Sequence, residues 1–86
     1  MQDKDFDNAE QIRSILTARL NIDKSTPYEK ISSEKVPSWD SFATVEIVLE
    51  IEKQFSISLS LNELTAFDSH ENILRVIGPK LASSHG

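Results

Sequence analysis

The fold of this chain is decided by the stretch Trp39-Asp40-Ser41-Phe42-Ala43-Thr44-Val45-Glu46-Ile47-Val48-Leu49-Glu50-Ile51-Glu52-Lys53-Gln54-Phe55. From Ser41 onward it has no glycine or proline and is rich in aliphatic residues, which predicts a helix over residues 41–55. On a helical projection more than half of the circumference is apolar, formed by Phe42, Val45, Val48, Leu49, Ile51 and Phe55, with Ile47 at the margin. Only a narrow sector remains for Ala43, Glu46, Glu50, Lys53 and Gln54. Because so wide an apolar arc is contacted from several sides, we expect this helix at the centre of a small bundle.

The start of this helix contains the residue of greatest functional interest. Aspartate and serine are both favoured N-cap types, so either Asp40 or Ser41 is expected to cap the helix. A helix N-terminus also offers unpaired N–H groups and a partial positive charge, which would suit a phosphate attached to Ser41. No neighbour of Ser41 in the sequence is suited to activate it as a nucleophile, so any modification of Ser41 is expected to need a second enzyme.

Upstream of this stretch, the sequence predicts one more helix and a long loop. The helix is expected over residues 7–20, because Asp7 and Glu10 have the spacing of a capping box. Its apolar stripe consists of Ala9, Ile12, Ile15, Leu16 and Leu20. Residues 21–39 lose this periodicity and contain two prolines, so they predict a loop. The side chains expected to pin that loop are Tyr28, Ile31, Val36 and Trp39.

Residues 55–61 alternate between apolar and polar side chains, a pattern that on its own predicts a β-strand. The chain has no second convincing strand, and a lone strand would leave its backbone groups without partners. We therefore interpret the segment as an extended connector that places Ile57 and Leu59 against the core.

The C-terminal part predicts a short helix over residues 60–67, opened by a capping box, and a last helix. Asp68 and Glu71 have capping-box spacing at the start of the last helix. Gly78-Pro79 is expected to stop or kink it.

These elements predict an all-α protein with a single domain over residues 1–86. It is a four-helix bundle with three main helices, one short helix and a long loop between the first two helices. The ends, at about residues 1–5 and 82–86, are expected to be flexible.

The composition excludes several classes of function. The 86 residues include nine basic and 14 acidic side chains, for a net charge of −5. Without a basic stripe, binding to nucleic acid is not expected. No cysteine is present, which excludes disulfides and zinc–thiolate sites. The longest aliphatic run is Ile47-Val48-Leu49, so no membrane span is expected. The N-terminus also lacks the pattern of a signal peptide, and we expect a cytoplasmic protein, most simply a monomer.

Two further constellations do not meet the requirements of their chemistry. Asp3, Asp5 and Asp7 imitate the start of a calcium loop, but the later ligand positions do not match. His70 and His85 are the only histidines, too few for a zinc site or a sheltered hydrolytic triad. We therefore expect neither a metal site nor an enzyme.

The stretch around Ser41 resembles the motif of the acyl carrier protein family. Trp39-Asp40-Ser41-Phe42, then Thr44-Val45-Glu46-Ile47-Val48, and finally Glu52-Lys53-Gln54-Phe55 follow the pattern of the modified serine and the second helix of that family. The likeness continues without a gap to Ile77, whereas residues 7–20 match in pattern only.

The resemblance implies an acyl-carrier-protein-like bundle with 4′-phosphopantetheine on Ser41, attached by a phosphopantetheinyl transferase. Acyl intermediates would be held as thioesters and delivered to an acyl- or aminoacyl-activating ligase, an acyltransferase or a ketosynthase. Asp40 would support the transfer reaction. The residues implied in partner binding are Phe42, Glu46 and Glu50. An acyl pocket would involve Val45, Leu49, Ile73 and Leu74.

Some positions depart from the family pattern. Phe42 replaces the usual leucine, Ala43 an acidic residue, and Lys53 and Gln54 part of an acidic cluster. A tryptophan directly before Asp-Ser, as at Trp39, resembles family members that serve specialised pathways rather than general lipid or fatty acid biosynthesis. Two alternatives to an acyl carrier stay open: an aminoacyl or peptidyl carrier, and an unmodified helical interaction module with the same fold.

Overall fold

Four α-helices and one 3-10 turn make up the part of the chain that the computed structural model describes, residues 3–83, with side chains for residues 7–81. In chain order they are α1 (Asp3–Leu20), η1 (Tyr28–Lys30), α2 (Ser41–Phe55), α3 (Leu61–Leu64) and α4 (His70–Ser83). Residues 3–83 contain no β-strand, only an isolated bridge between Ser32 and Ser69. The protein is therefore an all-α small bundle, and no helix in this range is long and apolar enough to cross a membrane.

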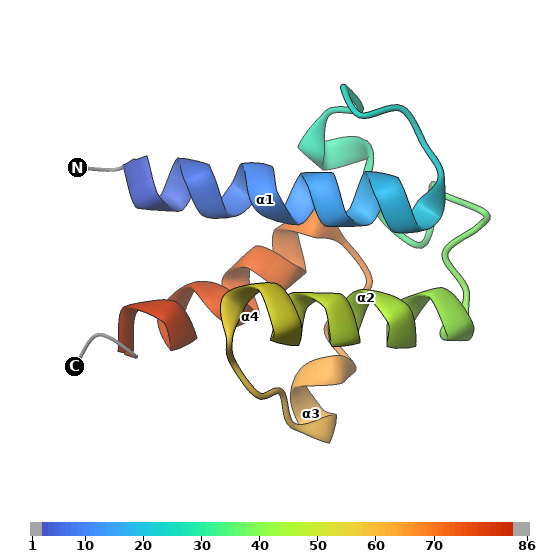
Figure 1. The fold of residues 1–86 in the computed structure, drawn as a ribbon. Helices are drawn as coiled ribbons and strands as arrows, with labels where there is room; N and C mark the ends of the chain where they lie inside the picture. The colour runs from blue at the N-terminus through green and yellow to red at the C-terminus, as the bar shows by residue number, and fades with distance from the viewer. Residues whose placement is uncertain (1–2, 84–86) are drawn as a thin grey trace.

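Helix α1 is the scaffold on which the other helices pack. It lies beside α2, which runs in the opposite direction, and it also packs against α4 (Figure 1). The turn η1 packs on α4, so the long first loop returns to the bundle. The largest fully buried apolar side chains are Ile12, Leu16, Leu20, Ile31, Ile47, Ile51, Ile73 and Ile77.

Helix α2 has the bounds that the sequence predicted, but it presents a different face to the core. The buried side chains of α2 are Ala43, Ile47, Val48 and Ile51. Phe42, Val45 and Leu49 point to solvent, with exposed fractions of 71%, 54% and 60%. The prediction that the whole apolar arc is covered was wrong, because α1 packs on one side of α2 and no described element covers the face that contains Phe42, Val45 and Leu49.

Helix α1 begins at Asp3, four residues before the predicted start. Asp7 therefore lies inside the helix and is not its N-cap. Glu10, the second residue of the expected capping box, instead accepts hydrogen bonds from the Tyr28 hydroxyl and the Arg13 guanidinium. Residues 3–5, expected in a flexible end, form the first turn of α1, whereas residues 1–2 lie outside the described residues.

The first loop and the connector after α2 are held as the sequence predicted. Ile31, Val36 and Trp39 are buried in the core. Ile57 and Leu59 are partly buried against it, and residues 56–60 form no strand, as expected for a connector. Helix α2 ends where Ser56 adopts a left-handed conformation, with φ 56° and ψ 47°.

In the last two helices one predicted cap is confirmed, and two predictions about α4 are wrong. Ser60 and Glu63 form the expected capping box of α3. At α4, however, the Ser69 hydroxyl accepts a hydrogen bond from the Asn72 N–H at 3.1 Å, so the expected Asp68–Glu71 box is absent. The helix also continues through Pro79 to Ser83 rather than stopping at Gly78. Proline removes one helical hydrogen bond, but packing of Leu81 against the core favours continuation.

Candidate functional site

Ser41 is the first residue of α2, and its side chain is exposed. Its hydroxyl makes no hydrogen bond within the described part of the chain. Asp40 is the N-cap: its Oδ1 accepts a hydrogen bond from the Ala43 N–H at 2.9 Å. The cap role is thus assigned to Asp40, and the Ser41 hydroxyl is left available to an incoming group.

The backbone around Ser41 offers unpaired donors. Among residues 3–83, the N–H groups of Ser41 and Phe42 have no hydrogen-bond partner, as is usual in the first turn of a helix. These groups carry the positive end of the α2 dipole, which stabilises a negative charge placed near Ser41. A negatively charged group on the exposed Ser41 oxygen would therefore be stabilised by these N–H groups.

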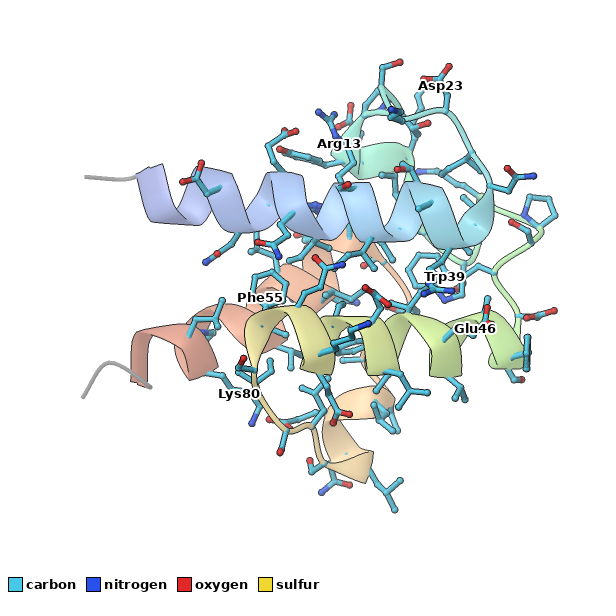
Figure 2. The ribbon with its side chains drawn as sticks, viewed as in Figure 1. Arg13, Asp23, Trp39, Glu46, Phe55 and Lys80 are labelled. Atoms are coloured by element: carbon cyan, nitrogen blue, oxygen red, sulfur yellow. The ribbon has the colours of Figure 1, made fainter. Side chains whose placement is uncertain are left out.

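Trp39 and Thr44 hold the chain on either side of Ser41. The Trp39 side chain is buried between α1 and the start of α2 (Figure 2). Its Nε1–H donates to Thr44 Oγ1 at 2.9 Å, and that hydroxyl donates to the Asp40 carbonyl oxygen at 3.1 Å. Thr44 was not among the site residues predicted from the sequence. Its signal there is a hydroxyl residue four positions after an N-cap, within reach of an aromatic donor.

An exposed apolar stripe begins directly beside Ser41. It consists of Phe42, Val45 and Leu49, which are three and four residues apart and so share one face of α2. Leu61, the first residue of α3, is 80% exposed. Single exposed apolar residues are normal on a surface, whereas contiguous apolar patches are typical of interaction surfaces, so this face of α2 is a candidate for one.

The two glutamates implied in partner binding occupy different environments. Glu46 lies on α2 (Figure 2) and is half-buried. It makes no hydrogen bond or ion pair with the residues that the structure describes. Glu50 faces α1, where its Oε1 accepts a hydrogen bond from Arg19 at 2.9 Å. Hydrogen bonds from Gln54 and Arg19 lower the pKa of Glu50. Glu50 therefore joins α1 to α2, and Glu46 is the carboxylate available to a partner.

The four residues of the implied acyl pocket do not share one environment. Val45 and Leu49 are exposed on the outer face of α2, whereas Ile73 is fully buried in the core. Leu74 lines a hollow of about 230 Å³ together with Tyr28, Glu29, His70 and Glu71.

His70, which was expected to be neither a zinc ligand nor the base of a hydrolytic triad, is buried beside this hollow. Its ring stacks on Tyr28 with a centroid distance of 4.3 Å, and its Nε2–H donates to the Ala9 carbonyl oxygen at 2.9 Å. Burial lowers the pKa of His70. Burial, and secondarily the hydrogen bond to Glu10, raises the pKa of Tyr28. The Arg13 guanidinium carbon lies over the Tyr28 ring, 4.9 Å from its centroid. The cluster ties η1 to both α1 and α4.

The described residues contain no group of three or more His, Cys, Asp or Glu side chains arranged to hold a metal ion. Comparison of the chain with protein-family models and with curated protein sequences found no match. What can be said about function therefore rests on the residues around Ser41 and on their geometry.

Proposed function

We propose that this chain is a carrier protein with the acyl-carrier-protein-like bundle, which holds 4′-phosphopantetheine on Ser41 and presents tethered acyl groups to partner enzymes. The observation that carries the proposal is the exposed, unbonded Ser41 hydroxyl at the first position of α2. A serine needed only for folding would use its hydroxyl as the cap, and here Asp40 does so.

The chain's own residues contribute position and charge rather than catalysis. In the transfer step, Ser41 Oγ forms the bond to the phosphorus of the pantetheine phosphate in coenzyme A, the nucleotide half leaves, and the serine proton passes to the transferase. The free N–H groups of Ser41 and Phe42, at the positive end of the α2 dipole, would stabilise the negative charge of the attached phosphodiester. The attached group supplies the thiol that a chain without cysteine lacks.

The partner enzymes dock on the outer face of α2 in this proposal. Its apolar stripe of Phe42, Val45 and Leu49 lies on the same helix as Ser41, and Glu46, next to this stripe on α2, is the available carboxylate. The partners are a phosphopantetheinyl transferase and an acyl- or aminoacyl-activating ligase, acyltransferase or ketosynthase. The cargo is an acyl or an aminoacyl group, and the carrier works as a cytoplasmic monomer in a specialised pathway.

Intact-mass analysis after incubation with coenzyme A and a promiscuous phosphopantetheinyl transferase tests the proposal. We expect one phosphopantetheine addition on the wild type and on Ser38→Ala, the matched control, and none on Ser41→Ala. The Ser38 hydroxyl lies three residues upstream and donates to the Leu20 carbonyl oxygen. Addition to Ser41→Ala, or no addition to folded wild type with several transferases, would contradict the proposal.

A second candidate is an unmodified helical interaction module. The apolar stripe favours it, because a row of exposed Phe42, Val45 and Leu49 can bind a partner whether or not Ser41 is modified. Binding of a partner enzyme that is equal for Ser41→Ala and for wild type treated with transferase would favour this candidate. Binding that requires the attached group favours the carrier.

A further inference from the structure

We infer that Trp39 and Thr44 are positioning residues that fix Ser41 for attachment of its prosthetic group, an inference that rests on the proposed carrier function. The two side chains form a directional relay of hydrogen bonds onto the backbone carbonyl of Asp40. Indole N–H is only a donor and a carbonyl only an acceptor. The Thr44 hydroxyl must therefore accept from Trp39 Nε1 at 2.9 Å and donate to the Asp40 oxygen at 3.1 Å.

The relay connects the core to the helix start. Trp39 is only 6% exposed, so its ring is held by packing, and a buried indole N–H requires a partner. Thr44 provides it and passes the constraint to Asp40, whose carbonyl also accepts from the Thr44 N–H at 3.0 Å. The Asp40 carboxylate is fixed independently by the Ala43 N–H at 2.9 Å.

Ser41 lies inside this closed set of contacts but takes no part in it. Both the carbonyl and the carboxylate of the preceding residue are fixed, so the direction in which α2 starts, and with it the Ser41 Cα–Cβ bond, is fixed too. The hydroxyl stays free to react. Since a transferase must bring this oxygen in line with the phosphorus it attacks, a small misplacement lowers the rate of the bound complex.

A positioning role predicts a specific kinetic signature. Loss of the relay should lower kcat for phosphopantetheine attachment, because the bound serine is misplaced. It should leave KM for the carrier unchanged, since the docking stripe of Phe42, Val45 and Leu49 is intact. A role confined to stability would change neither constant in a protein that is still folded.

The experiment measures kcat and KM of a phosphopantetheinyl transferase, with coenzyme A, on wild type, Thr44→Val, Thr44→Ser and Trp39→Phe. Thr44→Val keeps the size of the side chain but removes its hydroxyl, and we expect kcat to fall roughly three- to tenfold. Thr44→Ser, which retains the relay, should restore kcat. Trp39→Phe should also lower kcat, and its combination with Thr44→Val should cost less than the product of the single effects, because both remove one relay.

Ser38→Ala is the matched control, since it removes a hydrogen bond of the same loop that does not reach Asp40. Equal kcat for Thr44→Val and Thr44→Ser, or a loss confined to KM, would overturn the inference while leaving the carrier function intact. A folded wild type that accepts no prosthetic group from several transferases would overturn the proposed function and this inference with it.

Discussion

The inner side of the bundle contains a histidine, whereas the outer face of α2 exposes a phenylalanine, a valine and a leucine. His70 is 2% exposed and Phe42 is 71% exposed, the reverse of their hydropathies. His70 is accommodated by its hydrogen bond to the Ala9 carbonyl and by stacking on Tyr28. Phe42 stays outside because no described element covers that side of α2. Burial here is decided by available partners, and an apolar residue without one is a candidate for binding.

The largest effect should come from equal truncations on the two faces of α2. Ile47→Ala leaves a cavity in the core and should lower the free energy of unfolding by about 2–5 kcal/mol. Leu49→Ala, on the exposed face two residues away, should change it by less than about 0.5 kcal/mol. Urea denaturation followed by circular dichroism measures both. Similar losses for the two variants would show that the outer face is covered in solution.

Acidification should act on the inner side through His70. Its pKa is lowered from 6.5, mainly by burial, so the folded protein resists protonation at a pH where the unfolded chain already binds a proton. The contribution of His70 is therefore complete above about pH 6.5 and is lost as the pH falls, with a slope of at most about 1.4 kcal/mol per pH unit.

The matched variant for this titration is His70→Gln, which retains an N–H donor but does not titrate. Its free energy of unfolding should depend less on pH between about 5 and 6.5 than that of wild type, with His85 present in both proteins. Glu10 and Arg13 on α1, Glu29 beside Tyr28, and Glu71 on α4 also surround the cluster and are unchanged in this variant. Parallel pH profiles would contradict the burial of a neutral His70.

Substitutions at the start of α2 should affect stability and modification separately. Asp40→Ala removes the N-cap and should lower the free energy of unfolding by about 0.5–2 kcal/mol. Ser41→Ala should change it by less than about 0.5 kcal/mol, because its hydroxyl is unbonded, yet abolish phosphopantetheine attachment. Thermal unfolding and intact mass report the two effects. A larger loss of stability in Ser41→Ala than in Asp40→Ala would show that Ser41, and not Asp40, is the N-cap of α2.

A substitution on the outer face of α2 is expected to have the smallest effect on stability. Its effect on binding of the transferase should be large. Phe42→Ser should leave the free energy of unfolding within about 0.5 kcal/mol of wild type. It should raise KM of the transferase for the carrier, because the stripe loses its largest side chain. Ala18→Ser, an exposed change on α1, is the control. Unchanged KM would remove the stripe from the docking surface for this enzyme.

Much of the fold could be predicted because it depends on local rules. The bounds of α2, the capping box of Ser60 and Glu63, and the burial of Ile31, Val36 and Trp39 all follow from patterns within a few residues. The start of α1 could not be predicted in the same way. The side chains of Asp7 and Glu10 have capping-box spacing, but Glu10 is engaged with Tyr28, eighteen residues away.

The residue types at the start of α2 could be predicted from the sequence, but the rotation of the helix about its own axis could not. Ser41 and Asp40 stand at the helix start because their types favour that position. The side of α2 that faces the core was not predictable, because an arc apolar over more than half of the circumference fits against its neighbours in several rotations. Glu50 pairs with Arg19 and His70 with Ala9, contacts 31 and 61 residues apart that no local pattern specifies.

The burial of Trp39 has a practical consequence. It is the only tryptophan of the chain, and its indole N–H donates a hydrogen bond to the Thr44 hydroxyl. Its fluorescence thus originates from a single place, the start of α2 beside Ser41. A red shift of the Trp39 emission would therefore report exposure of the core to water. A change in its emission intensity would report attachment of a group to Ser41.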